Sequence, residues 1–287
     1  MFSLSRIFRY LWPHIKKYWL SGALVFLGYL IGIIFDSILK PYLYKEIIDA
    51  LSSGLPREVI LSRAMYLIML IIGAVVIHYV SYRAGDYANS YFQSKVMKRL
   101  HDFTFRMLMG HSYTFFSNNF SGSIVAKAKR FTKSFENFAD VISFQVWFSL
   151  VTLIGIFIVL FFVNHLLAYI FLFWAILYIV VTLLFIRRKI RYDILEAEAD
   201  SRVTARLADA ILNIMNIKIF SSRHREEEGF QSVTADEEQK RRTDWYFGNL
   251  QNAMQALLMA ILQVSVIFVS VKLWYLGKIT LGTIVLT

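Results

Sequence analysis

Cysteine is absent from the 287-residue sequence, and proline occurs only at positions 13, 41 and 56. The absence of cysteine excludes disulfide bonds and cysteine-ligated metal sites. Proline disrupts helix interiors, because it lacks a backbone N–H and its ring clashes with the preceding turn. The long proline-free stretch after Pro56 therefore permits very long helices.

Charged residues are also scarce, at 18% of the chain against about 25% in soluble domains. Hydrophobic residues make up 57% and gather in runs long enough to cross a bilayer, which takes about 17–25 residues. These runs are residues 20–39, 64–82, 138–163, 166–186 and 253–276, with a sixth run beginning at Ile279. Since backbone groups in hydrocarbon must be satisfied within their own segment, we expect helical spans. The sequence predicts an all-α membrane protein with a six-helix bundle whose last span is incomplete at Thr287.

The spacing of the runs is uneven. Asn164 and His165 alone separate the third run from the fourth, whereas long charged segments follow the second and fourth runs. Both long segments lie on one side of the membrane if every run crosses it. A helix from about Glu58 to Met109 would be about 75 Å long at 1.5 Å per residue, more than twice the hydrocarbon thickness. We therefore expect helices that project deep into water on that side.

The charge distribution identifies this side. Residues 1–19 carry four basic residues and no acidic one, and residues 83–133 carry nine basic residues against two acidic ones. Lysine and arginine near span ends favour the cytoplasmic side. We expect a multi-pass protein of the plasma (inner) membrane, with its N-terminus and both long extensions in the cytoplasm. Because topology accounts for much of the net charge of +11, nucleic-acid binding is disfavoured.

Two segments have amphipathic patterns. Residues 1–19 alternate basic with apolar and aromatic residues, which is typical of a helix in the lipid headgroup region, although a solvated start to the first span is an alternative. In residues 187–219, apolar side chains recur at helical spacing, at Ile190, Ile194, Ile211, Met215 and Ile219 among other positions. Such a stripe in water requires another helix to cover it.

Turn-forming residues interrupt each extension. The first break, Gly110–Gly122, is rich in Gly, Ser and Asn and contains four aromatic residues. The second break is expected at Phe220–Phe230. Aromatic side chains at such a tip favour either a docking surface for another domain or packing against neighbouring extensions.

These features together resemble the transmembrane domain of ABC exporters of the multidrug and lipid-flippase type. The stretch 113–122 resembles the aromatic pair and glycine of the first coupling helix, and residues 202–230 resemble the approach to the second. Residues 277–282, Gly-Lys-Ile-Thr-Leu-Gly, are similar to the turn into the last span. The resemblance covers residues 20–287, preceded by an amphipathic elbow helix over residues 1–19. A proline before the aromatic pair and an acid after the first coupling helix, both common in the family, are replaced here.

The resemblance implies partners for the chain. Two such transmembrane domains pair as a homodimer or heterodimer in the bilayer, and each is coupled to a cytoplasmic nucleotide-binding domain that binds ATP. ATP binding there switches a central cavity from inward to outward facing. The residues implied at the transmission surface are Tyr113, Phe115, Phe116, Gly122, Phe220 and Arg223.

Catalytic and metal-binding motifs are not found in the sequence. A phosphate-binding loop requires the pattern G-x-x-x-x-G-K-[ST], and the only Gly-Lys pair, Gly277-Lys278, is followed by Ile279. We therefore expect no ATPase site or cofactor in this chain, with ATP and magnesium bound by a separate nucleotide-binding domain. The six histidines lack a metal-ligand spacing. The lack of a nucleotide-binding domain in the sequence suggests a truncated product or a fragment. A split system with a separate ATPase subunit is the less favoured explanation.

Polar residues within the runs are candidates for a substrate pathway, because polar groups at membrane depth are often functional. They are Asp36, Gln145, Gln255 and Gln263. Hydrogen bonding between helices is the alternative role for the amides. Arg83 and Asp86 are spaced to pair on one helix face.

Two alternatives to an exporter remain at this stage. The chain could be an inactive fragment of such a transporter. It could also be an unrelated polytopic channel or secondary transporter, although such proteins usually show internal repeats or broken spans. The substrate cannot be inferred, because fold does not determine it.

Overall fold

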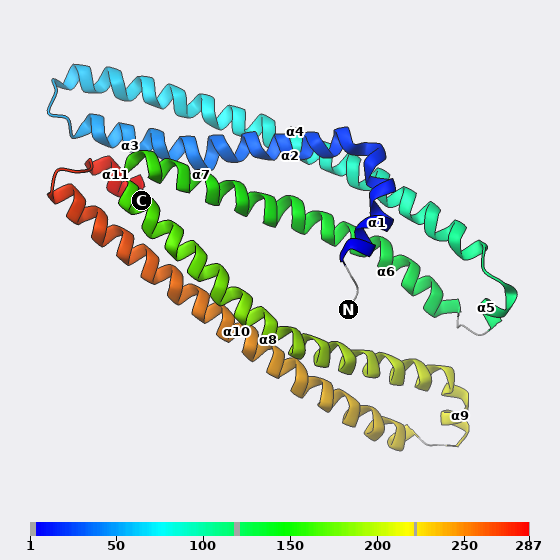
Figure 1. Ribbon diagram of the computed structural model, residues 1–287. Coiled ribbons are helices and arrows are strands. Elements are labelled where there is room, and N and C mark those ends of the chain that lie inside the picture. The colour runs from blue at the N-terminus through cyan, green and yellow to red at the C-terminus, as the bar shows by residue number, and fades with distance from the viewer. Residues whose placement is uncertain (1–3, 118–120, 221–222, 287) are drawn as a thin grey trace. The chain divides into compact units, whose positions relative to one another are not determined.

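The computed structural model describes residues 4–117, 121–220 and 223–286, and every regular element in these ranges is helical. The chain divides into two compact units (Figure 1). Unit 1 comprises residues 1–165 and 270–287, and unit 2 comprises residues 166–269. The predicted all-α fold class agrees with these elements.

Unit 1 contains most of the helices and both chain ends. Its elements are α1 (Leu4–Ile15), η1 (Lys16–Tyr18), α2 (Trp19–Ile33), η2 (Ile34–Leu39), α3 (Lys40–Leu51), α4 (Arg57–Met109), α5 (Tyr113–Ser117), α6 (Ser121–Asp140), η3 (Val141–Val146), α7 (Trp147–Val163) and α11 (Leu281–Leu286). The helix expected from Glu58 to Met109 is therefore present almost as predicted, as α4.

Glycine brings α2 and α4 together closely within unit 1. A Cβ atom on Gly28 would lie 2.8 Å from the backbone oxygen of Ser81 and 3.0 Å from Gly85. Tyr29 packs against Gly85 and is buried in a cluster with Val25 and Ile33. Small residues let the backbones of transmembrane helices come into contact and increase the dispersion contacts between them. These contacts matter because, in lipid, the hydrophobic effect does not drive helices together.

Two π-helical segments interrupt the α-helical geometry of unit 1. The first, η2, immediately precedes Lys40-Pro41, where an α-helix would lose a hydrogen bond at the proline nitrogen and bring its ring against the carbonyl of Ser37. A wider turn relieves this clash. The second segment, η3, joins α6 to α7 without any proline. Straight α-helical spans were expected at both places, and neither π segment was predicted.

The N-terminal helix packs against the rest of unit 1 along one face. Leu11 of α1 is buried in a core with Val96, Leu100, Phe135 and Ala139 of α4 and α6. Arg9 and Tyr10 of α1 are exposed, as are Lys16 and Lys17 of η1, which follows it. The amphipathic pattern of the sequence thus corresponds to one protein-facing side and one basic, aromatic side.

Unit 2 is a hairpin of two long antiparallel helices. It is formed by α8 (His165–Leu212), the short α9 (Ile214–Ile219) and α10 (Arg223–Tyr275). The Trp174 indole N–H donates to the carbonyl of Leu258 at 3.0 Å, and the Gln255 amide donates to the Thr182 hydroxyl at 3.2 Å. Figure 1 shows α8 and α10 running side by side in this hairpin.

Five helices in the described part of the chain are long and apolar enough to cross a membrane, by length and composition. They are Arg9–Leu51, Arg57–Met109, Lys127–Val163, His165–Leu212 and Arg223–Tyr275. Each contains all or nearly all of one of the five complete apolar runs of the sequence and extends well beyond it at one end or both.

Candidate functional site

The tip between α4 and α6 carries a short helix, α5. Phe115 stacks on His111, with ring centroids 4.2 Å apart, and meets the ring of Phe116 edge-on at 5.3 Å. Both phenylalanines are half-buried, whereas Tyr113 is 87% exposed. Gly122 lies in the first turn of α6. Phe115 and Phe116 thus form a small cluster with His111, from which Tyr113 projects, and Phe120, the fourth expected aromatic residue, lies outside the described residues.

The tip of unit 2 differs from the expected turn. The break begins at Asn213 rather than at Phe220, and the short helix α9 follows within it. The side-chain amide of Asn213 donates to the backbone and carboxylate oxygens of Asp209, in the last turn of α8. Arg223, Gly229 and Phe230, which the sequence analysis placed in the turn, lie within α10. The expectation of a turn extending through residue 230 is therefore wrong.

The sequence analysis named Phe220 as a tip residue and placed Met215 and Ile219 on the apolar stripe, but it did not predict that α9 and its flanks form one exposed apolar surface. Phe220 is 77% exposed, and Leu212, Met215 and Ile219 beside it are also largely exposed. Arg223, the other predicted residue here, is exposed and pairs with Glu227 at 2.7 Å on its own helix. Behind α9 lies a cavity of about 700 Å³ whose lining includes Leu207, Ile214 and Phe230. Single exposed apolar residues are common, whereas these four lie together at one tip.

Ion pairs hold α8 to α10 along the part of the hairpin nearer its tip. Five pairs among the described residues join the two helices: Arg206 to Glu226 at 2.6 Å, Arg202 to Asp236 at 2.6 Å, Lys189 to Asp244 at 2.9 Å, and Arg241 to Glu196 at 3.3 Å and to Asp200 at 3.8 Å. Hydrogen bonds from Lys240 and Arg202 hold the pKa of Asp236 below its ordinary value. Because several charges act together, this seam is stronger than isolated surface pairs would be.

The seam uses a different face of α8 from the apolar stripe of the sequence. Within the described structure, Ile190, Ile194 and Ile211 are exposed, whereas Ala199 is buried and Arg206 half-buried. The cover expected for the stripe is thus not supplied by α10. Ion pairs and the stacked rings of Tyr192 and Phe247, 4.2 Å apart, lie at the contact between the helices, whereas these isoleucines lie on an outer face.

The four candidate pathway residues have different surroundings. Asp36 lies in η2 and forms an ion pair with Lys40, one turn along the chain. Gln145 lies in η3 and is exposed, as is Gln263 in α10. Gln255 is bonded to Thr182, which matches the helix-bridging alternative. The structure brings none of these four into contact with another among the described contacts.

A polar group in α2, α4 and α6 was only partly anticipated. Arg83 and Asp86 form the predicted pair at 2.9 Å. Asp86 also accepts a hydrogen bond from the Tyr29 hydroxyl at 3.1 Å, and Gln93 donates to Asp140 at 2.7 Å. The tyrosine and glutamine contacts join residues far apart in sequence, so helical spacing alone gives no signal for them.

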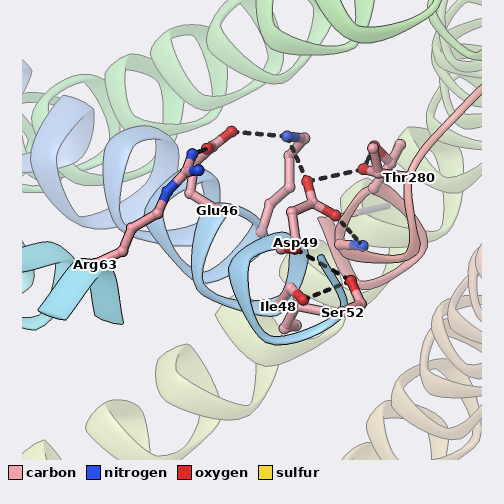
Figure 2. A network of polar contacts seen from close by, with 9 residues as sticks. Glu46, Ile48, Asp49, Ser52, Arg63 and Thr280 are labelled. Atoms are coloured by element: carbon pink, nitrogen blue, oxygen red, sulfur yellow. Dashed lines mark hydrogen bonds and ion pairs between the residues drawn. The ribbon is translucent and has the colours of Figure 1, made fainter. Parts of the chain in front are cut away.

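A second polar group joins α3 to α11 at the opposite end of α4 from α5. Asp49 accepts from the Thr280 hydroxyl and from the Gly282 backbone N–H, both at 2.8 Å, and pairs with Lys45 at 2.9 Å (Figure 2). Glu46, one turn earlier on α3, pairs with Lys45 at 2.9 Å and Arg63 at 3.4 Å. None of these residues was among the predicted sites.

Comparison with known structures finds the same fold in a membrane transporter. The structure of a bacterial Atm1-family ABC exporter with ATP bound matches with a TM-score of 0.75 and 19% sequence identity. The match covers 94% of this chain and 47% of that exporter chain, so the present chain spans about half its length. Comparison with curated proteins gives no significant match.

The family of the chain follows from its sequence as well as from its fold. Residues 23–287 match the ABC transporter transmembrane region. This range includes four of the five complete apolar runs, most of the first run and both tips. The family excludes the alternative of an unrelated channel or secondary transporter, and it agrees with the helical bundle described above. The chain belongs to the ABC transporter transmembrane family and has the fold of an exporter transmembrane domain.

Proposed function

We propose that this chain forms half of the translocation pathway of an ATP-driven exporter and docks a nucleotide-binding domain through α5 and α9. The observation that carries the proposal is the presence of a short helix at the turn of each long extension. Each exposes apolar or aromatic side chains, Tyr113 on α5 and Met215 and Ile219 on α9, within segments that are otherwise highly charged.

Burial of these side chains gives the docking its driving force. An apolar side chain moved out of water contributes about 1.5–3 kcal/mol when fully buried. Tyr113 and Phe220 protrude and can insert into a partner surface, whereas the half-buried Phe115 and Phe116 pack edge-on against each other within the first tip. Arg223 supplies a charged rim beside Phe220. Such aromatic anchors with polar surroundings are typical of protein interfaces.

The ion-pair seam makes unit 2 suitable for transmitting force. A docking domain that moves α9 also moves the ends of α8 and α10, because Arg206 and Glu226 join these helices next to it. Lys189 and Asp244 repeat the connection farther along. The two helices then move together as one rigid hairpin. Through this movement, ATP binding in the docked domain switches the central cavity from inward to outward facing. ATP and magnesium belong to that domain, since this sequence has no phosphate-binding loop.

A second transmembrane domain is the proposed cover for the outer face of α8. Ile190, Ile194 and Ile211 are exposed among charged residues of the extension, and a paired domain would remove them from water. The basic N-terminal segment and first extension favour a cytoplasmic location for the N-terminus and both tips. The exposed basic and aromatic face of α1 then lies toward the inner lipid headgroups.

Gln145 and Gln263 are the pathway residues that the surroundings favour most. Both are exposed, and neither is bonded to another predicted pathway residue. Asp36 and Gln255 remain proposed pathway residues, but each has a partner within its own unit, Lys40 and Thr182 respectively. Polar groups without an internal role are the ones left to contact a passing molecule.

The docking proposal is tested by substituting the protruding aromatics in the complete transporter. Tyr113→Ala and Phe220→Ala are each expected to weaken association with the nucleotide-binding domain by roughly tenfold or more, as anchors do. Tyr275→Ala is the matched control, because Tyr275 is equally exposed but lies at the other end of α10. Association is measured by co-purification and ATPase activity. Equal behaviour of all three variants would refute docking through the tips.

A further inference from the structure

Asp49 uses both carboxylate oxygens to hold α11. Oδ1 accepts from the Gly282 N–H, and Oδ2 accepts from the Thr280 hydroxyl while pairing with Lys45. Figure 2 shows Asp49 on α3 with its carboxylate directed toward Thr280. Thr280 and Gly282 lie more than 230 residues away along the chain. We call the contact of Asp49 with these two residues the α3–α11 latch.

The latch depends on close backbone approach. A Cβ atom on Gly282 would lie 2.3 Å from the backbone oxygen of Lys45 and 2.7 Å from Asp49 Oδ1. Both neighbours are held in place, the first by the backbone of α3 and the second by its three hydrogen bonds. Only glycine at position 282 therefore allows the carboxylate to reach the backbone N–H.

The contacts of Asp49 with Thr280 and Gly282 that join α3 to α11 are polar. The buried residues of α11 are Gly282 and Thr283, and neither has a large apolar side chain. Thr280 is exposed, so water can compete for its hydroxyl. Hydrogen bonds contribute modestly when water can replace them, whereas a buried apolar contact must be separated at full cost. Such a contact is suited to open and close again.

The position of the latch along the chain connects it with unit 2. The chain passes between the units twice, next to His165 and next to Ser270. The segment after the second passage completes α10, turns at Gly277 with φ of +68°, and reaches Thr280 and Gly282. A displacement of unit 2 against unit 1 is therefore applied directly to the segment that Asp49 holds.

We propose that the α3–α11 latch keeps the far end of unit 1 closed and releases α11 when the transporter opens to the outside. This inference rests on the proposed function, because ATP-driven movement of unit 2 supplies the displacement. Asp49 is a positioning residue in this account. Breaking its contacts favours the open arrangement without touching the nucleotide-binding domain.

The distance between two spin labels placed on either side of the latch tests the proposal without knowledge of the substrate. Spin labels are placed at Ser53→Cys and Lys278→Cys, which are exposed positions beside the latch in a sequence that has no cysteine. The complete transporter is measured in lipid, first without nucleotide and then trapped with ATP and vanadate. We expect one short distance in the first state and a longer population in the second. One unchanged distance in both states would overturn the latch.

Single substitutions show which residue holds α11 in place. Asp49→Ala is expected to raise the ratio of long to short distances without nucleotide about tenfold, since it removes hydrogen bonds to a charged group. Thr280→Val should raise it less, and Thr280→Ser should restore it. Glu46→Ala is the matched control, because it removes a carboxylate that pairs with Lys45 and Arg63 but makes none of the latch contacts.

The outcomes separate the latch from the proposed function. If Asp49→Ala and Glu46→Ala have the same distance distribution, the latch is refuted even when nucleotide lengthens the distance. Association with the nucleotide-binding domain and basal ATPase activity are measured on the same samples. If association and basal ATPase activity are present but the spin-label distance does not change, the proposed function stands and the latch is refuted. Their absence in the unsubstituted protein refutes the proposed function itself.

Discussion

Arg206 of α8 and Glu226 of α10 form an ion pair, with 2.6 Å between Nη2 and Oε2, beside the turn that carries α9. Both side chains also line the cavity behind α9. Arg206 has a second close neighbour, since a Cβ atom on Gly229 would lie 3.0 Å from its Nη2. The orientation of α9 therefore depends on a charged contact between the two helices that it connects.

Removing this contact should loosen the tip of unit 2. In Arg206→Ala, the backbone amides of Ile214–Ile219 are expected to exchange hydrogen roughly two- to fivefold faster, because a partly exposed pair contributes up to about 1 kcal/mol. Arg225→Ala is the matched control, since Arg225 is exposed on the same stretch of α10. Hydrogen exchange followed by mass spectrometry measures both. Equal exchange in the two variants would contradict the role given to Arg206.

The α8–α10 seam should respond to acid. Hydrogen bonds from Lys240 and Arg202 lower the pKa of Asp236 from its ordinary value of 3.8. A carboxylate with a lowered folded-state pKa contributes its full stabilisation above the ordinary pKa and loses it as the pH falls through the folded value. A spin-label distance between α8 and α10 near Asp236 should therefore stay constant from about pH 5 to 8 and broaden below about pH 4. Asp236→Asn should reduce this dependence, and the carboxylates of the other pairs account for the remainder.

Close packing between α2 and α4 gives a prediction about stability. Gly28→Ala places a methyl group against the backbone of Ser81 and Gly85, so one of the helices must shift. Overpacking of this kind costs typically about 1–3 kcal/mol. Gly73→Ala is the control within the same helix pair, because nothing lies within 4 Å of its added Cβ atom. The melting temperature in detergent should fall for the first variant and stay equal or rise for the second.

The pathway residues differ in a way that mutation can detect. Gln145→Leu and Gln263→Leu should alter substrate-stimulated ATPase activity and leave basal activity intact. Gln255→Leu should mainly reduce stability, because it removes the hydrogen bond to Thr182. Stimulated and basal ATPase activities together with the melting temperature separate these effects. Unchanged stimulation in the first two variants would remove them from the pathway.

Long elements could be predicted from the sequence because they depend on local properties. The expected helix from Glu58 to Met109 and the observed α4, Arg57–Met109, agree almost residue for residue. Pro56 before the helix and Gly110 after it are strong local end signals. The resemblance of these features to ABC exporter transmembrane domains is confirmed by the family match over residues 23–287.

The contacts between helices could not be predicted in the same way. Apolar residues of α8 were expected to meet a partner helix, yet Arg202 and Arg206 make that contact and Ile211 is exposed. A helical stripe identifies a face that needs covering but not the molecule that covers it. The latch between Asp49 and Gly282 joins residues more than 230 positions apart, so no local pattern indicates it.

The most direct test of the account is photo-crosslinking from α9 in the complete transporter. A crosslinking amino acid at Phe220 should capture the nucleotide-binding domain, whereas the same amino acid at Tyr275, equally exposed at the far end of α10, should not. Capture from position 275 but not from position 220, or from neither in a transporter with active ATPase, would contradict docking through α9.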